Sequence, residues 1–261
     1  MSSEQTGPIE AAQSRAAGPP SLALLLLEVP RTLVAASLLL PALPLLRRAP
    51  RGDGHPVLVL PGFSASDRST RLLRRYVTSL GYKTHGWKLG RNLGLAGGLH
   101  KQLIERLAEL HERHGRRVSL VGWSLGGIYA RELAKLMPET VRRVITLGSP
   151  FGGEQQGFDP WILRLVTGRE LPARLQARLN RLRPPPPVPS TAIFTKSDGI
   201  APWRACREMD ADGTENIEVV ASHCGLGFHP VALYAVADRL AQPEGTFARF
   251  DRRGLRRAFY G

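Results

Sequence analysis

Cysteine is scarce in this chain. Its 261 residues include two cysteines, Cys206 and Cys224, and no C-x-x-C pair or Cys/His set has the spacing of a metal site. The sequence therefore predicts no metal centre, and two thiols alone do not indicate an oxidising compartment. Whether the two thiols form a disulfide is left open, because bridging depends on geometry that sequence does not give.

Lysine is also scarce. Only five of the 36 basic residues are lysine, and the arginines are scattered along the chain rather than clustered. The formal net charge of +14 raises nucleic acids and anionic membranes as partners. No zinc-finger spacing, RNP-like motif or helix-turn-helix signature accompanies that charge, so no nucleic-acid partner is expected. Attraction to acidic lipid headgroups remains open.

A clean hydrophobic run of membrane-spanning length is missing as well. Residues 1–20 are polar and predicted to be disordered, whereas residues 21–48 form a hydrophobic segment that Glu28 and Arg31 interrupt. Three prolines are expected to break that segment, and no basic n-region marks a signal peptide (Pro30, Pro41 and Pro44). Two interpretations remain: a helix packed on the domain, or peripheral membrane contact through residues 21–48. The compartment stays open between the cytoplasm and a membrane surface.

From His55 onward, strand and helix patterns alternate. Strands are predicted at 57–60, 82–88, 117–123, 141–147, 191–195 and 216–220. Helices are predicted at 69–80, 95–114, 126–136, 201–209 and 230–241. This alternation predicts an α/β fold with a mostly parallel sheet of about six strands and helices on both faces. The expected domain covers residues 55–245, with a small helical cap or lid insertion at 151–189 and a basic tail at 246–261.

The motif Gly122-Trp-Ser-Leu-Gly126 stands between a strand pattern and a helical pattern. A G-x-S-x-G in this setting places the serine on a sharp turn, with its hydroxyl exposed above the sheet. The glycines have a steric reason, because strand and helix cross closely there. Ser124 is therefore the predicted nucleophile, and it needs a base that a third group orients.

The acid and the base are expected to follow the serine in that order. Asp198 stands where the fifth predicted strand passes into a loop, so it is the predicted acid. His223 and His229 compete for the base. His223 leaves the end of the sixth strand and is favoured, whereas His229 precedes a helix and is placed to cap it. Two further acidic residues are fallback candidates for the acid (Glu154 and Asp159).

Acyl chemistry also needs donors for a developing oxyanion. The backbone N–H of Leu125, directly after the nucleophile, is one expected donor. The N–H of Phe63, in the loop Leu60-Pro-Gly-Phe-Ser64 after the first strand, is the other, and Gly62 lets this loop approach the substrate. The motif-like stretch 86–92 has no predicted role beyond a turn.

Together these motifs resemble the α/β-hydrolase superfamily, especially its lipase and esterase members. The resemblance rests on H-P-V-L-V-L-P-G-F at 55–63, G-W-S-L-G-G at 122–127, K-S-D-G at 196–199 and S-H-C-G-L-G-F-H-P at 222–230. It implies that Ser124, Asp198 and His223 are nucleophile, acid and base. One departure is Pro61-Gly62, since many bacterial lipases have His-Gly there, with a histidine side chain that braces the loop.

The resulting hypothesis is a serine hydrolase that cleaves a small-molecule ester or lipid and needs no metal or organic cofactor. An acyltransferase with the same triad and a lipid or alcohol acceptor is the alternative. A hydrolase-fold binding protein without activity is a third hypothesis, which the intact serine, histidine and aspartate disfavour. Acyl chain length and oligomeric state are not predicted.

Overall fold

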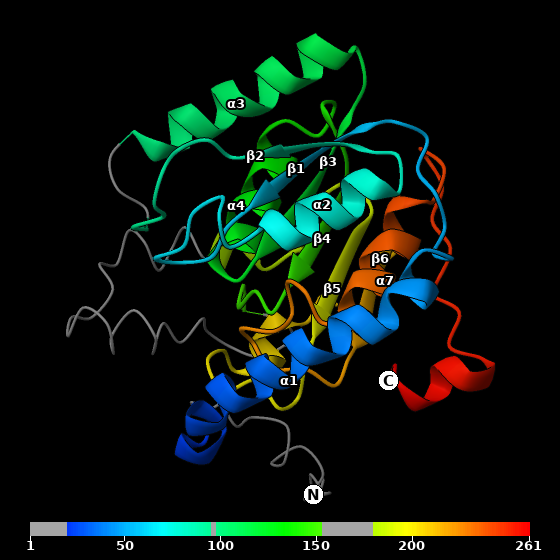
Figure 1. The fold of residues 1–261 in the computed structure, drawn as a ribbon. Coiled ribbons are helices and arrows are strands. Elements are labelled where there is room, and N and C mark those ends of the chain that lie inside the picture. Colours follow the sequence, from blue (N-terminus) through cyan, green and yellow to red (C-terminus); the bar gives the residue numbers. More distant parts are fainter. Residues whose placement is uncertain (1–19, 95–97, 153–179) are drawn as a thin grey trace, which may run out of the picture.

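A sheet of parallel strands forms the centre of the protein (Figure 1). The computed structural model describes residues 20–94, 98–152 and 180–261. In spatial order, the strands are β2 (Lys83–Gly86), β1 (Pro56–Leu60), β3 (Val118–Trp123), β4 (Val141–Leu147), β5 (Ser190–Phe194) and β6 (Thr214–Glu218). Every pairing between neighbours is parallel, which confirms the predicted fold class. The chain reverses its direction across the sheet between β1 and β3, the position at which such folds bind ligands.

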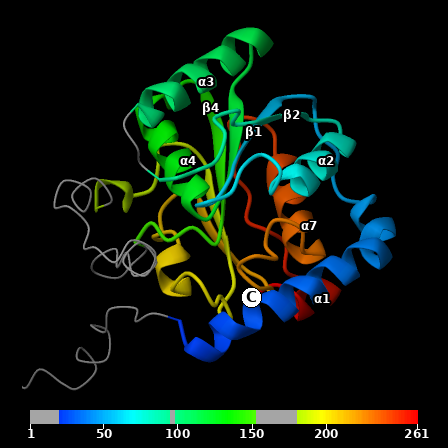
Figure 2. The same cartoon turned by 60° about the vertical axis from the view of Figure 1, so that its left-hand side comes forward.

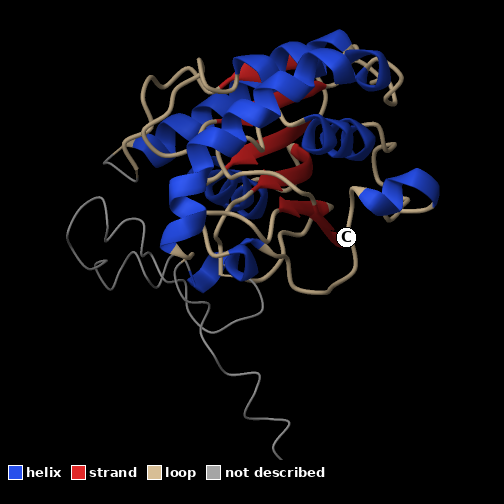
Figure 3. Ribbon diagram, turned by 60° about the horizontal axis from the view of Figure 1, so that its bottom comes forward, coloured by secondary structure: helices blue, strands red, loops and turns tan. Residues whose placement is uncertain are grey.

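Helices cover both faces of the sheet, because the central strands carry apolar residues on both sides. Val57 and Val59 of β1 pack toward α2 (Arg71–Ser79) and α7 (Pro230–Leu240). Leu58 and its neighbours pack toward α3 (Leu99–His114) and α4 (Leu125–Leu136). The two helical layers lie on opposite sides of the strands (Figures 2 and 3).

The segment 201–209 differs from the prediction. It contains only the short 3-10 helix η2 (Trp203–Cys206), and Arg207 already has extended backbone angles. The amide groups of Ile200 and Ala201, which precede η2, donate to the side chain of Asp198. A tight turn therefore replaces the first part of the predicted α-helix.

The hydrophobic N-terminal segment is one continuous helix, α1 (Leu22–Leu46), so the expectation that its prolines break it is wrong. The three prolines lie on exposed positions, where carbonyl groups that lose a helical partner can bond to water (Pro30, Pro41 and Pro44). Ser21 caps the helix by accepting a hydrogen bond from the N–H of Leu24. One face packs on the domain through buried Leu46 and partly buried Leu39.

The C-terminal residues 246–261, expected as a basic tail, pack on the same core. Phe250 and Tyr260 are buried with the residues of α7, and Tyr260 forms a β-bridge with Val219. The short 3-10 helix η3 (Gly254–Ala258) lies between the two aromatic residues in sequence. Of the expected cap insertion, residues 153–179 lie outside the described part of the chain, as do residues 95–97 at the start of the predicted third helix.

Candidate active site

Ser124 occupies the turn between β3 and α4. Its backbone has φ 53° and ψ −122°, a conformation that costs non-glycine residues on the order of 1–3 kcal/mol. The N–H of Ser124 donates to the carbonyl of Leu147 on β4 at 2.8 Å. A side chain at Gly126 would collide with the backbone of Leu60 and Pro61, so only glycine fits there. The close crossing of strand and helix thus holds a strained serine at the end of β3.

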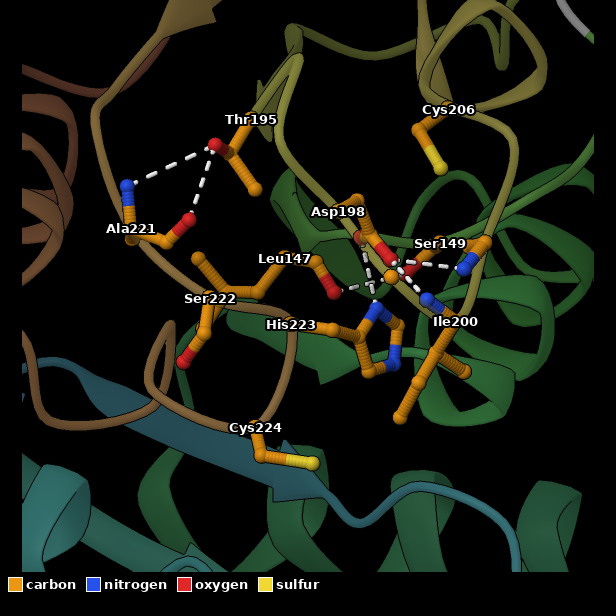
Figure 4. Close-up of polar contacts among 12 residues, drawn as sticks. Leu147, Ser149, Thr195, Asp198, Ile200, Cys206, Ala221, Ser222, His223 and Cys224 are labelled. Atoms are coloured by element: carbon orange, nitrogen blue, oxygen red, sulfur yellow. Dashed lines mark hydrogen bonds and ion pairs between the residues drawn. The ribbon is translucent and has the colours of Figure 1, made fainter. Parts of the chain in front are cut away.

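Asp198 and His223 form a buried pair at the same edge of the sheet (Figure 4). Nδ1 of His223 lies 2.7 Å from Oδ2 of Asp198, and the two residues are only 4% and 3% exposed. The other carboxylate oxygen accepts hydrogen bonds from the N–H groups of Ile200 at 2.8 Å and Ala201 at 2.6 Å. Both oxygens are therefore engaged, and the ring of His223 is oriented with its second nitrogen turned away from Asp198.

The pair lies next to the serine turn. The indole Nε1 of Trp123, the residue before the serine, donates to the carbonyl of His223 at 3.1 Å. A Cβ at Gly148, directly after the Leu147 that binds the serine amide, would lie 3.1 Å from Nδ1 of His223. The Oγ of Ser124 has no hydrogen bond to any described residue, so the serine–histidine contact itself is not formed in this structure.

Two opposing effects act on the protonation of His223. Burial lowers the pKa of the imidazole, whereas the charge and hydrogen bond of Asp198 and the charge of Glu28 raise it. The effects that raise the pKa are larger in sum than the effect of burial, so the pKa of His223 lies above its ordinary value. The imidazolium form is thereby stabilised, which suits a base that must hold a proton during a reaction.

The competing histidine, His229, and the buried His55 both have other partners. Nδ1 of His229 accepts a hydrogen bond from the N–H of Val231 and so caps α7, the alternative that its position before Pro230 had indicated. His55 is fully buried between Asp53 and Ser119, and burial lowers its pKa to about 4. The fallback acids lie outside the described residues (Glu154 and Asp159).

The predicted oxyanion donors flank the serine. A Cβ at Gly62 would lie 3.2 Å from Cβ of Ser124, which places the loop after β1 directly beside the turn. Within the described part of the chain, no acceptor takes the backbone N–H of Phe63 or of Leu125. Both groups are therefore free to donate to a bound oxyanion.

Sequence reasoning missed the residue that braces this loop. Asn92 is fully buried, and its Nδ2 donates to the carbonyl of Pro61 at 2.9 Å. Its backbone carbonyl accepts from the N–H of Ser64 at 2.6 Å, and its Oδ1 accepts from the hydroxyl of Tyr129 at 3.1 Å. The loop that departs from the lipase pattern is thus held by an asparagine side chain. The motif-like stretch 86–92 that ends at Asn92 was the only signal for it.

The two cysteines remain free thiols. Cys206 is buried, its Sγ donates to the carbonyl of Pro202, and burial raises the pKa of its thiol. Cys206 and Cys224 lie on opposite sides of the Asp198–His223 pair (Figure 4). The disulfide that the sequence left open does not form here, so no bond between these two cysteines links the loops after β5 and β6. Among the described residues, no cluster of histidine, cysteine and acidic side chains could hold a metal ion.

A parallel sheet with a serine turn after β3 and an acid–histidine pair beyond β5 and β6 defines the α/β-hydrolase architecture. A model of the alpha/beta hydrolase family matches residues 38–258, so the chain belongs to that family. The predicted superfamily is thereby confirmed. No curated protein matches the chain.

Solved structures with this fold include lipases and esterases. Lipase B of Aspergillus fumigatus matches with a TM-score of 0.54 and 15% identity, over 73% of this chain and 53% of the lipase. The monoacylglycerol lipase of Paleococcus ferrophilus gives 0.51 and 15%, over 74% and 96% of the two chains. Naproxen esterase (carboxylesterase NP) of Bacillus subtilis gives 0.50 and 15%, over 74% and 86%. The chain spans about half the length of the Aspergillus lipase, and at these identities the likeness is one of fold.

The raised pKa of His223 leads to a prediction. The folded protein binds the proton of His223 more tightly than the unfolded chain does. Protonation of His223 therefore stabilises the fold below the ordinary histidine pKa, and this stabilisation is lost as pH rises through the raised pKa of His223. Asp198→Asn should lower the pKa of His223, as measured by NMR titration of histidine-labelled protein. His229, which does not contact Asp198, is the internal control. An unchanged titration of His223 in the variant would contradict the pairing.

Proposed function

We propose that the protein is a serine hydrolase that cleaves carboxylic esters through an acyl-enzyme on Ser124. The observation that carries the proposal is the buried Asp198–His223 pair beside a strained serine at the end of β3. Such a constellation supplies a nucleophile, a base and a group that orients the base. Membership of the alpha/beta hydrolase family, and the lipases and esterases that share the fold, support esters as the substrate class.

In the proposed reaction, the second nitrogen of His223 takes the proton of Ser124 as the hydroxyl attacks the ester carbonyl. Asp198 holds the imidazole through Nδ1 and stabilises the imidazolium. The N–H groups of Phe63 and Leu125 donate to the oxyanion. His223 then returns the proton to the leaving alcohol. Water, activated by the same imidazole, releases the acid from the serine.

Loss of the nucleophile should abolish activity without unfolding the protein. Ser124→Ala should lower hydrolysis of p-nitrophenyl esters by about 10⁴- to 10⁶-fold, because the other triad members cannot act without it. Labelling by a fluorophosphonate probe should disappear in the same variant. Labelling that persists in Ser124→Ala would refute the nucleophile. A wild-type protein that neither labels nor hydrolyses would favour the non-enzymatic binding protein.

The same assay with an added alcohol separates hydrolysis from acyl transfer. If most of the acyl group is transferred to the alcohol to form a new ester, the protein is an acyltransferase rather than a simple hydrolase. A series of esters of increasing acyl chain length then defines the substrate range.

The brace at Asn92 should matter for turnover. Asn92→Ala should lower kcat by roughly ten- to hundredfold, because the loop that carries Phe63 loses its hold on the oxyanion position. It should also lower the free energy of unfolding by about 1–3 kcal/mol, because the buried carbonyl of Pro61 loses its partner.

Asn216→Ala is the matched control. The side chain of Asn216 also bonds to backbone groups, those of Glu208, but it does so at β6 and away from the oxyanion loop. It should cost stability and leave kcat unchanged, as measured by urea unfolding and ester kinetics. An equal loss of kcat in both variants would contradict a specific role for Asn92.

We also propose that the outward face of α1 rests on the surface of an anionic bilayer. On the side of this helix that faces away from the domain, large apolar residues are 44% to 74% exposed, and several recur at helical spacing (Leu22, Leu26, Val29, Leu33 and Leu40). The exposed Arg47 and Arg48 follow the helix in a chain of net charge +14, which complements acidic headgroups.

By length and composition α1 could also cross a membrane. Its opposite face, however, is bonded to the domain: Glu28 is buried, and Arg31 donates to the carbonyl of Ser197. A spanning orientation would break these bonds and bury both charges in hydrocarbon. A helix lying on the surface keeps them.

Polar substitutions on the outward face should release the protein from vesicles. The triple variant Leu26→Asn, Val29→Asn, Leu33→Asn should reduce co-sedimentation with phosphatidylserine-containing vesicles by roughly tenfold or more, because each apolar side chain contributes on the order of 1 kcal/mol. Leu72→Asn, Leu136→Asn, Phe259→Asn is the matched control, since it changes three exposed apolar residues elsewhere. Equal binding by both variants would contradict the proposal, as would a wild-type protein that dimerises through this face and ignores vesicles.

A further inference from the structure

The two side chains of the candidate acid and base come from separate loops, after β5 and after β6. One carboxylate from a third element binds both loops. Oε1 of Glu28 on α1 accepts from the N–H of Gly199 at 2.8 Å and from the N–H of His223 at 3.0 Å. Oε2 accepts from the N–H of Cys224 at 3.0 Å. Glu28 therefore contacts the residue after Asp198 and the backbone of the histidine itself.

The next turn of α1 adds contacts to the same two loops. The guanidinium of Arg31 donates to the carbonyl and the hydroxyl of Ser197, each at 2.5 Å, and to the carbonyl of Ala221. The hydroxyl of Thr32 lies 3.0 Å from that of Ser222. The face of α1 formed by Glu28, Arg31 and Thr32 thus binds residues on both sides of the acid–histidine pair.

The fit between helix and loop is close. A Cβ at Gly199 would lie 2.6 Å from the backbone carbonyl carbon of Leu24, so no side chain fits between α1 and the loop that carries Asp198. Glu28 is 3% exposed, although it belongs to an otherwise apolar stretch of helix.

Burying a carboxylate is costly, and a well-packed apolar side chain would attach a helix more cheaply. Simple attachment of α1 therefore does not account for this residue. What a carboxylate adds is three directional, charge-assisted hydrogen bonds that end on two different loops.

We propose that Glu28 is a positioning residue that sets the distance and orientation between the loops of Asp198 and His223. This inference rests on the proposed hydrolase function and extends the active site to the N-terminal helix. The carboxylate of Glu28 bonds to backbone N–H groups of these loops. It acts through the backbone of the loops, whereas the outward side of the same helix faces away from the domain.

Glu28 also acts on the imidazole electrostatically. Within the described part of the chain, the charged and titratable groups near His223 include Asp198 from the β5 loop, Glu28 from α1 and the adjacent Cys224, and Arg31 of α1 bonds to the backbone two residues earlier. Burial lowers the pKa of His223, and the charges of Asp198 and then Glu28 raise it. Removal of the Glu28 charge should therefore lower that pKa, an effect that a purely structural contact would not produce.

The test compares Glu28→Gln with Glu105→Gln in the full-length protein. Glu105 is exposed on α3 and paired with Lys101, so the control makes the same chemical change away from the site. Glu28→Gln should lower kcat by roughly ten- to hundredfold with little change in KM, because the acid and base lose their alignment. The acidic limb of its kcat/KM profile should move to lower pH. Glu105→Gln should match the wild type in both.

Two further variants keep the inference testable if Glu28→Gln does not fold. Glu28→Asp retains the charge but is one methylene shorter, so kcat should fall while the acidic limb stays nearer the wild-type position. Arg31→Met removes the bonds to Ser197 and Ala221 but keeps Glu28, so it should also lower kcat. Because it removes a positive charge, it should not move the acidic limb to lower pH. Thermal unfolding of each variant is measured to establish that the variant is folded under assay conditions.

The outcomes separate the two proposals. A wild-type protein that fails to hydrolyse esters and fails to label at Ser124 overturns the hydrolase function. A wild type that hydrolyses esters, with folded Glu28 variants that keep its kcat and pH profile, overturns the positioning role and leaves the hydrolase intact. A loss of kcat with a shifted acidic limb supports the role of Glu28.

Discussion

The hydrogen bond between Nδ1 of His223 and Oδ2 of Asp198 depends on parallel strands that end at one edge of the sheet. The parallel arrangement brings the loops after β3, β5 and β6 out on the same side of the sheet, so that Asp198 and His223, which are 25 positions apart, become neighbours. The same parallel sheet stabilises the strained backbone of Ser124. Gly126, which packs against the end of β1, and the hydrogen bond from the N–H of Ser124 to the carbonyl of Leu147 on β4 hold the turn in place.

Helix α1 joins two properties that usually belong to separate elements. Its domain-facing side carries Glu28 and Arg31 and bonds to the loops of the acid and the histidine. Its outward side is apolar and exposed. Both sides belong to one helix, so the contacts with the candidate site and the exposed apolar face lie on the same element.

Much of the architecture followed from local patterns. Short apolar runs indicated the buried strands, and a 3.6-residue period of apolar residues indicated the amphipathic helices. Glycines at fixed spacing indicated the turn at Ser124. Each of these signals depends only on residues that are close in sequence. The helix after Asp198 was predicted too long, because the Asp198 side chain takes the amide groups of Ile200 and Ala201. The prolines of α1 were expected to end the helix, but at exposed positions water can replace the lost bonds.

By itself the sequence determined the order of strands and helices, the serine turn and a short set of acid and histidine candidates, because each depends on neighbours along the chain. The tertiary structure decided which candidates meet: His223 bonds to Asp198, while His229 caps α7. It also decided that the cysteines stay apart. The contacts of Asn92 with Pro61 and of Glu28 with His223 join residues 31 and 195 positions apart, and no local pattern encodes such distances.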